Sequence, residues 1–279
     1  MITNLRTQTR IEKKFRDLAK HDAGGLIIYL TAGDPNLEAT GDLLPALERA
    51  GADVIELGVP FSDPLADGPV IQRASERALK AGATLPKILA ALPEWRRRTK
   101  LPLVLFSYYN PILQYGLKKF ATDAQKAGVD GVLAVDLVPE EAAPYVEAMR
   151  KENLDSIFLA SPTSSNERLG KIAKLSTGFL YLVSRMGVTG EQKDVSIELQ
   201  ALVNRVKTAS RLPLAVGFGI STAIQVRTVQ QYAEAAVVGS AIVRYIEQNY
   251  SSQGVSGTEK FVSQLKGNEK RWPYRGQGA

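Results

Sequence analysis

Short apolar runs alternate with longer segments of helical periodicity along the chain. The apolar runs are rich in Val, Ile and Leu and alternate little with polar residues, which is typical of parallel strands buried on both faces. They predict strands at 26–31, 53–58, 103–106, 131–135, 156–159, 179–183, 214–216 and 235–238. The intervening segments predict helices at 36–50, 69–81, 84–98, 117–127, 139–152, 165–175, 196–208 and 221–231, followed by another at 240–249.

This succession of strand and helix units favours an α/β fold, a (β/α)8 TIM barrel, which typically needs about 250 residues. Leu5, Ile11, Phe15 and Leu18 are partly periodic and predict an extra N-terminal helix. We expect a single domain over residues 1–266 and a basic, mobile C-terminal tail over 267–279. A doubly wound open sheet is the structural rival, but its glycine fingerprint is missing after the first predicted strand.

The composition excludes several kinds of chemistry. The chain has no cysteine, so it has no disulfide framework, thiol nucleophile or thiolate metal site. Its one histidine is His21, which argues against a Ser-His-Asp triad and against a multi-histidine metal site. Acid–base chemistry must therefore come from Asp, Glu, Lys or Tyr, and no metal site is expected.

The formal charge of +6 is concentrated at the two ends of the chain. Residues 1–25 carry six basic and three acidic groups, and residues 266–279 carry four and one, so the middle is neutral. This distribution does not indicate a nucleic-acid-binding face. No apolar stretch is long enough to span a bilayer, and the N-terminus lacks the apolar region of a signal peptide. We therefore expect cytoplasmic residence.

Two carboxylates stand out at the second predicted strand. Glu56 lies near the end of this apolar run, and Asp67 lies in the proline-rich loop that leaves it. A carboxylate on a buried strand is costly unless it is paired or used. Because catalytic groups of α/β barrels lie at the C-terminal strand ends, Glu56 and Asp67 are the candidate catalytic pair.

Glycines follow the last two predicted strands and predict an anion site. One cluster is 217–221 and the other begins at Gly239-Ser240, which opens the final helix. Backbone N–H groups at a helix N-terminus bind anions, and the loops after strands seven and eight are the usual phosphate position in barrels. The alternative is that these glycines only make tight turns. The long loop 184–193 is either a mobile lid contributing Thr189 and Gly190 or an ordinary surface loop.

Aromatic residues near the predicted strand ends suggest a pocket for a flat ligand. They are Tyr29, Phe106, Tyr108, Tyr109, Phe179 and Tyr181. Core packing explains each of them equally well when it is taken alone. Tyr181 is the most suggestive, since a phenol at a strand end can also hydrogen-bond a substrate. Asp136, after the fourth strand, either binds substrate or caps a helix, and we favour a structural role.

Several of these motifs together resemble the tryptophan synthase alpha subunit family. The matching segments are 29–35, 55–69, 107–111, 187–190, 217–221 and 239–242, and the likeness extends over about residues 12–266. The long segment 55–69 is the most specific. The resemblance departs at 232–236, which is one residue shorter than the family's usual turn before the last strand.

The resemblance implies a cofactor-free barrel that splits indole-3-glycerol phosphate into indole and glyceraldehyde 3-phosphate, a retro-aldol lyase reaction. It assigns acid–base catalysis to Glu56 and a second catalytic role to Asp67. Tyr181 would position the substrate, while Tyr29 and Phe106 would border the indole. The phosphate region would be formed by Thr189, Gly190, Gly217, Phe218, Gly219, Gly239 and Ser240.

The resemblance also implies a partner, the beta subunit, which carries pyridoxal phosphate and joins indole to serine. The expected assembly is an alpha–beta–beta–alpha heterotetramer in which indole is channelled between subunits. The loops 62–67 and 185–195 would face that partner, with Asp63 and Pro64 as candidate contacts.

Three other functions stay open at this point. The chain could be a stand-alone indole-3-glycerol phosphate lyase that is active without a beta subunit. It could also be a catalytically silent barrel that only activates the beta subunit, although intact Glu56 and Asp67 weigh against this. A sugar-phosphate isomerase on the same barrel is a weaker alternative.

Overall fold

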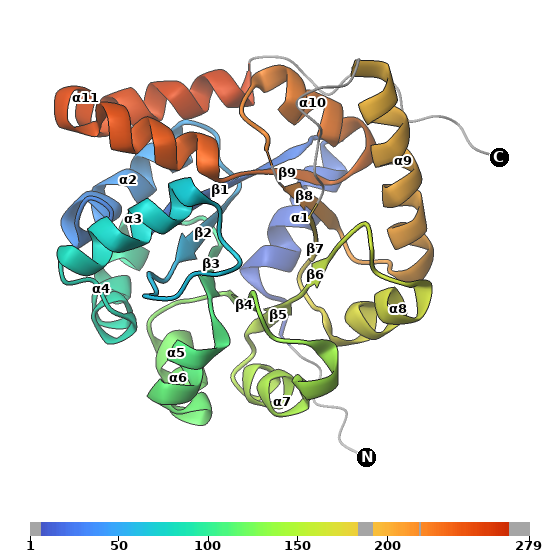
Figure 1. The fold of residues 1–279 in the computed structure, drawn as a ribbon, viewed down its shortest axis with the longest axis horizontal. Coiled ribbons are helices and arrows are strands. Elements are labelled where there is room, and N and C mark those ends of the chain that lie inside the picture. The colour runs from blue at the N-terminus through green and yellow to red at the C-terminus, as the bar shows by residue number, and fades with distance from the viewer. Residues whose placement is uncertain (1–6, 184–191, 218, 268–279) are drawn as a thin grey trace.

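In the computed structural model, which describes residues 7–183, 192–217 and 219–267, parallel strands form a barrel surrounded by helices (Figure 1). The strands are β1 Gly25–Thr31, β2 Val54–Gly58, β3 Leu103–Ser107, β4 Gly131–Ala134, β5 Asp155–Ile157, β6 Leu159–Ala160, β7 Leu180–Val183, β8 Leu214–Gly217 and β9 Ala235–Val238. The helices are α1 Arg10–Lys20, α2 Leu37–Arg49, α3 Pro69–Lys80, α4 Leu85–Arg98, α5 Tyr109–Tyr115, α6 Leu117–Lys126, η1 Pro139–Glu141, α7 Ala143–Lys151, α8 Asn166–Leu175, α9 Gln192–Ala209, α10 Ala223–Tyr232 and α11 Ser240–Lys266.

The strand order confirms the predicted TIM barrel. Hydrogen-bonded neighbours follow the order β5-β4-β3-β2-β1-β9-β8-β7-β6. The two ends of this order, β5 and β6, are separated in the chain by Phe158 alone, so the barrel closes there. The predicted strand 156–159 is therefore two short strands that pair with opposite neighbours. The predicted helix 139–152 is likewise divided, into η1 and α7, and α5 was not predicted.

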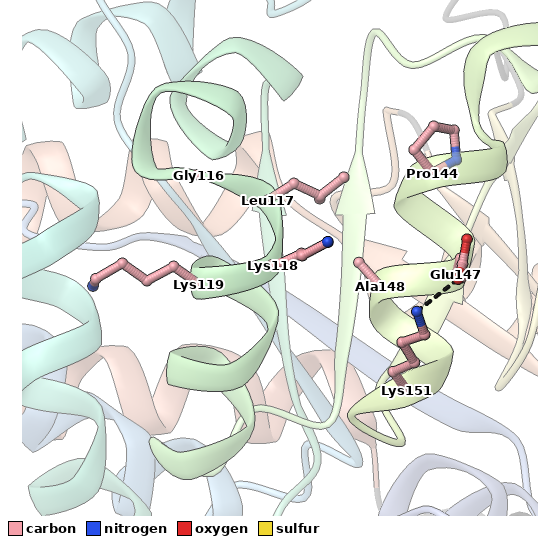
Figure 2. A pocket seen from close by; sticks show the side chains of 8 residues that line it. All are labelled: Gly116, Leu117, Lys118, Lys119, Pro144, Glu147, Ala148 and Lys151. Atoms are coloured by element: carbon pink, nitrogen blue, oxygen red, sulfur yellow. Dashed lines mark ion pairs between the residues drawn. The ribbon is translucent and has the colours of Figure 1, made fainter.

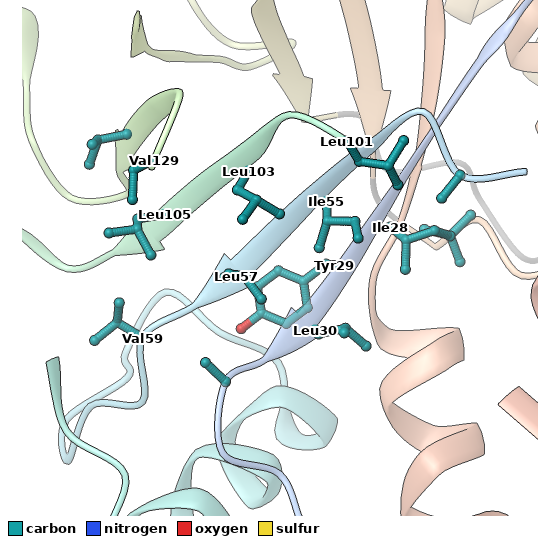
Figure 3. Close-up of a cluster of buried hydrophobic side chains, with 14 of the residues drawn as sticks. Ile28, Tyr29, Leu30, Ile55, Leu57, Val59, Leu101, Leu103, Leu105 and Val129 are labelled. Carbon is teal, nitrogen blue, oxygen red and sulfur yellow. The ribbon is translucent and has the colours of Figure 1, made fainter. Parts of the chain in front are cut away.

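The strands are apolar on both faces because each face is covered. Outward-facing side chains pack against the surrounding helices, and Figure 3 shows those of three adjacent strands. They include Ile28, Leu30, Ile55, Leu57, Leu103 and Leu105. The intervening residues form a second cluster inside the barrel, with Ile27, Val54 and Val104 among its members. Both sets are buried, which explains why the sequence shows little alternation.

Helix α1 closes the end of the barrel at which the strands begin, called here the amino mouth. Thr9 caps the helix and forms a capping box with Glu12. Of the residues that predicted this helix, Ile11, Phe15 and Leu18 lie in α1, and Leu5 lies outside the described residues. Ile11 and Phe15 belong to the interior cluster, and the Phe15 and Phe179 ring centroids are 5.6 Å apart. The predicted N-terminal helix is thus a plug for the barrel (Figure 1).

Carboxylates at the amino mouth accept hydrogen bonds from N–H groups at or next to the first residue of neighbouring strands. Asp53 accepts from Leu26 N at 2.9 Å, and Asp130 accepts from Leu103 N at 2.8 Å. Lys14 of α1 and Lys266 at the end of α11 both lie near Asp53, at 3.5 and 2.6 Å.

The short segment 232–236 keeps the same arrangement. Glu234 Oε2 accepts from Leu214 N at 2.9 Å, which gives this glutamate the role that Asp53 and Asp130 have elsewhere. Strand β9 then pairs with β1 and β8 and leads directly to Gly239. The departure from the family pattern therefore does not disturb the strand that leads to the predicted phosphate region.

No helix in the described part of the chain combines the length and the apolar character that a membrane span requires.

Candidate active site

Glu56 is the central residue of β2 and points into the barrel. Val54 belongs to the interior cluster, and side chains two residues apart on a strand share a face. The residue is only 1% exposed, and no described residue hydrogen-bonds its Oε1. Burial raises the pKa of Glu56 to about 8. An unpartnered buried carboxyl costs stability, and such groups mark functional sites.

The raised pKa predicts that this residue destabilises the fold as the pH increases. The carboxyl has a pKa near its usual 4.5 in the unfolded chain and about 8 in the fold. Between these values the folded state holds more protons, so the free energy of unfolding falls as the pH rises. Glu56→Gln removes the titrating group, so the free energy of unfolding of the variant, relative to that of the parent, should be higher at pH 9 than at pH 5. Urea denaturation at both pH values measures it, and a pH-independent difference would contradict the assignment.

The end of the barrel at which the strands finish, opposite α1, is called here the carboxyl mouth. The Tyr29 side chain of β1 is directed toward this end and lies across the neighbouring strand β2. It pairs with Glu56 in the strand register, and a Cβ built on Gly58 would lie 2.0 Å from its hydroxyl. The Tyr29 ring meets Phe106 edge to face at 5.4 Å, and Thr31 Oγ1 donates to its hydroxyl at 3.5 Å. The three predicted residues Glu56, Tyr29 and Phe106 thus come together on three neighbouring strands.

Tyr181 repeats this arrangement on the other side of the barrel. A Cβ built on Gly217 of β8 would lie 2.3 Å from the Tyr181 hydroxyl, so the phenol of β7 crosses this glycine. Burial raises the pKa of Tyr181, and the charges of Glu56 and the Tyr29 phenol raise it further. Both phenols are therefore neutral hydrogen-bond donors near Glu56. Gly217, which the sequence assigns to the phosphate region, also provides the space for Tyr181.

Gly58→Ala is expected to lower the free energy of unfolding by about 1–3 kcal/mol, because its Cβ would overlap Tyr29 and the core around it is closely packed. The matched control is Gly170→Ala in α8, where a Cβ meets nothing within 4 Å. That change should stabilise the helix by roughly 0.5–1 kcal/mol. Chemical denaturation measures both variants, and equal stability of Gly58→Ala and its parent would refute the crossing of Tyr29 over β2.

Asp67 is held in the loop between β2 and α3 by Tyr108. The Tyr108 hydroxyl donates to Asp67 Oδ2 at 3.2 Å and accepts from Ala66 N at 2.8 Å. The loop backbone is fixed as well, since Asp67 N donates to Pro64 O at 3.0 Å and Gln72 Nε2 donates to Asp67 O at 2.9 Å. Burial raises the pKa of Asp67 to about 6, against the lowering effect of the Tyr108 hydrogen bond.

The two carboxyls both interact with the Tyr29 phenol and differ in environment. Burial raises the pKa of Tyr29, and the charges of both Asp67 and Glu56 raise it further, which requires all three groups to be close. Glu56 is the more deeply buried of the two and protonates first as the pH falls, whereas Asp67 stays ionised to about pH 6. Such a pair can divide the roles of proton donor and anion.

The structure assigns different places to the other aromatic candidates. Tyr108 contacts Asp67 directly, a role that the sequence did not indicate. Phe179 lies at the amino mouth against Phe15, so it cannot line a pocket at the carboxyl mouth. Tyr109 begins α5, and its N–H donates to Asp136 at 2.7 Å, which gives Asp136 the structural role that we favoured.

The glycines after β8 and β9 lie at the carboxyl mouth beside the two tyrosines. Gly239 is the N-cap of α11 and makes no side-chain cap, and no described residue accepts from the N–H groups of Ser240 or Ala241. Free N–H groups at a helix N-terminus suit an anion. Gly219 has φ of 74°, a left-handed conformation that favours glycine.

The neighbouring helix α10 is less suited to an anion, because its own side chains satisfy its first turn. Thr222 and Gln225 form a capping box there, and Ser221 N donates to Gln225 Oε1 at 2.8 Å. Three predicted residues, Thr189, Gly190 and Phe218, lie outside the described residues, as does most of the predicted lid 184–193.

Three of the four large apolar side chains that are exposed among the described residues follow β2, β3 and β4, and the fourth is Ile224 in α10. Leu65 after β2 is 92% exposed, Leu113 in α5 after β3 is 48% exposed, and Val138 after β4 is 38% exposed. Strands β2, β3 and β4 are neighbours in the sheet, so the three residues follow adjacent strand ends, and they are called here the apolar rim. The predicted contacts Asp63 and Pro64 lie beside Leu65, Asp63 exposed and Pro64 half-buried.

A hollow on the outside of the barrel is unrelated to this site. It has a volume of about 500 Å³ and lies between α6 and α7, where Leu117, Pro144 and Ala148 line it together with lysines (Figure 2). Lys151 there pairs with Glu147 at 2.6 Å. Among the described residues, no cluster of three or more His, Cys, Asp or Glu side chains is arranged to hold a metal ion.

Comparisons with known proteins agree with one another. The family model described as tryptophan synthase alpha chain matches residues 15–270. The tryptophan synthase alpha chain of Solibacter usitatus is 52% identical over 259 residues, which are 92% of this chain and 97% of that protein. The crystal structure of tryptophan synthase subunit alpha from Legionella pneumophila has a TM-score of 0.87 at 39% identity and covers 93% of this chain and 98% of its own. A crystal structure of tryptophan synthase from M. tuberculosis, in its aminoacrylate-bound form, has a TM-score of 0.83 at 34% identity and covers 93% and 98%.

Proposed function

The chain belongs to the tryptophan synthase alpha chain family, and from this premise we propose that it cleaves indole-3-glycerol phosphate to indole and glyceraldehyde 3-phosphate. The observation that carries the proposal is the buried carboxyl of Glu56, whose Oε1 has no hydrogen-bond partner among the described residues. Burial raises the pKa of this carboxyl to about 8. Such a group is protonated at neutral pH and can transfer that proton to carbon.

The reaction breaks the bond between indole C3 and the glycerol chain. Glu56 gives its proton to indole C3, and the resulting carboxylate accepts the proton of the substrate hydroxyl as a carbonyl forms. The electron pair of the broken bond returns to the indole ring, so no oxidant, water or metal is consumed. Glu56 ends the cycle protonated, as it began. A rigid strand suits this role, because proton transfer requires accurate positioning.

Asp67 stabilises the charge that appears during the reaction. Protonation of C3 makes the indole nitrogen electron-poor, and an ionised carboxylate that accepts its N–H opposes that charge. The pKa of about 6 keeps Asp67 ionised at neutral pH. Tyr108, which donates to Oδ2, holds the carboxylate in one orientation.

The remaining candidates bind the two ends of the substrate. Phe106 and Tyr29 border the indole, and the Tyr181 hydroxyl meets the glycerol chain. Gly217, Gly219, Gly239 and Ser240 offer backbone N–H groups for the phosphate, and Thr189, Gly190 and Phe218 are proposed to complete this region. No cofactor is needed in this chain.

The beta subunit is the proposed partner, in an alpha–beta–beta–alpha heterotetramer whose pyridoxal phosphate belongs to the partner. The apolar rim of Leu65, Leu113 and Val138 supports docking over the carboxyl mouth, because exposed apolar surface next to a site favours association. Asp63 and Pro64 lie on this rim. Channelling of indole and cytoplasmic residence are part of the same proposal.

Indole release from indole-3-glycerol phosphate, measured with and without a beta subunit, tests the function. Slow release that rises sharply with the partner is the expected result. Fast release that the partner does not change would indicate a stand-alone lyase. Activation of the beta subunit without any cleavage would indicate a silent partner, and absence of both activities would refute the proposal.

A further inference from the structure

Four charged side chains link three elements that surround the proposed active site. Arg77 Nε and Nη2 donate to the two carboxylate oxygens of Asp34 at 2.9 and 2.7 Å. Arg77 Nη1 donates to Glu247 Oε1 at 2.7 Å. Arg73 donates to both oxygens of Glu247, at 2.8 and 2.9 Å. Arg77 therefore bridges two carboxylates, and the four residues are called here the arginine clamp.

Each element in the clamp leads directly to a part of the proposed site. Asp34 lies in the turn after β1, the strand of Tyr29. Arg73 and Arg77 lie on α3, which begins two residues after Asp67. Glu247 lies two turns into α11, whose first turn carries the proposed phosphate site. Helices α3 and α11 pack side by side (Figure 1). The clamp therefore joins the helix that follows Asp67 to the helix that begins at the proposed phosphate site.

The pair between Arg77 and Asp34 is more buried than an ordinary surface ion pair, whereas the Arg73 side chain is 49% exposed. The Asp34 side chain is only 4% exposed, and those of Arg77 and Glu247 are 31% and 23% exposed. The Arg73 hydrogen bond lowers the pKa of Glu247 to about 2, with a further contribution from Arg77. Bidentate arginine–carboxylate pairs also fix direction, because the planar guanidinium accepts one orientation of its partner.

A substrate that reaches from Asp67 to Ser240 requires a fixed spacing between α3 and α11. We propose that Arg77 is a positioning residue for the reaction, because it sets the orientation of α3 against α11 through Asp34 and Glu247. This inference rests on the proposed function for its effect on turnover, but the orientation itself can be measured independently.

The kinetic test uses Arg77→Gln and a milder variant, Glu247→Gln, which leaves the pair between Arg77 and Asp34 intact. The matched control is Arg49→Gln, which removes a bidentate pair with Glu259 between α2 and the far part of α11. Each chain is assayed in complex with the beta subunit. Arg77→Gln should lower kcat/KM by about ten-fold, and the milder Glu247→Gln should lower it by less, since small misplacements are costly to turnover. The control should stay within about two-fold of the parent.

Glycerol 3-phosphate separates positioning from a general loss of structure, because it reaches only the phosphate end of the site. Its inhibition constant should stay within about two-fold of the parent in both test variants. A parallel loss of glycerol 3-phosphate affinity and thermal stability would mean that Arg77 is merely structural. Unchanged kcat/KM in both variants would also overturn the proposal.

A spectroscopic measurement tests the orientation without any assay of turnover. The chain has no cysteine, so cysteines placed at the exposed positions Glu76 and Gln248 can carry nitroxides on α3 and α11. Dipolar EPR should show a shifted or broadened distance in Arg77→Gln and the parent distance in Arg49→Gln. An unchanged distance in Arg77→Gln would refute the proposal that Arg77 sets the orientation of α3 against α11. If the parent cleaves no substrate, the proposed function fails while this measurement still decides whether Arg77 orients α3.

Discussion

Glu56→Gln is expected to lower kcat for cleavage of indole-3-glycerol phosphate by about 10²- to 10⁴-fold, the usual contribution of a positioned acid–base group. Glutamine fills the same space in β2 but has no proton to give to carbon. Because the side chain is already neutral at pH 7 in the parent, the substitution changes little in the charge of the site. Substrate affinity should therefore be retained, which single-turnover and inhibition measurements separate from kcat.

Asp53→Asn is the matched control for this variant. Asp53 is another buried carboxylate, directly before β2, but it lies at the amino mouth and accepts from Leu26 N. Its loss should lower stability and leave kcat within a few-fold of the parent. The parent's kcat/KM should also decline above about pH 8 as Glu56 ionises. Full activity of Glu56→Gln, or an unchanged decline at alkaline pH, would sink the acid–base role.

Asp67→Asn is expected to lower kcat/KM by about 10²- to 10³-fold, the loss typical of one electrostatic group at a developing charge. Asparagine can still accept a hydrogen bond but carries no charge to oppose the cationic indole. In the parent, kcat/KM should rise with pH through about 6 as Asp67 ionises. The variant should lack this rise, and a pH series of initial rates measures it.

Tyr108→Phe provides the comparison for Asp67. It removes the hydrogen bond to Oδ2 while leaving the carboxylate charge, so its loss should be smaller than that of Asp67→Asn. The pKa of Asp67 should rise, because the Tyr108 hydrogen bond lowers it, and the acid side of the profile should move upward. An equal effect of the two variants would mean that the charge of Asp67 matters less than its placement.

The sequence predicted the barrel because its strands are apolar on both faces and its helices are periodic. It did not predict the break at Phe158, since a single residue that interrupts a strand leaves the apolar run intact. Helix α5 was missed for a similar reason. It is only seven residues long, too short to show helical periodicity, and it contains a proline.

Within the proposed site, the sequence predicted candidate residues but not their contacts. The predicted strand 53–58 and β2 both end at Gly58, but the sequence did not show how completely the Glu56 carboxyl is buried. The crossing of Tyr29 over Gly58 depends on the register between β1 and β2, which no local pattern encodes. The contact between Tyr108 and Asp67 joins residues 41 positions apart in the chain, so it too required the fold.

The shared carboxylate of Asp53 brings the two ends of the folded barrel to one place. Lys14 in the first helix and Lys266 at the end of the last both reach it, on the face opposite Glu56 and Asp67. A short linker could therefore join these ends, and new termini opened in another loop of that face would give a circular permutant with an unaltered reactive surface. Attachment of the protein to a support through either of these ends would likewise leave its carboxyl mouth directed away from the support.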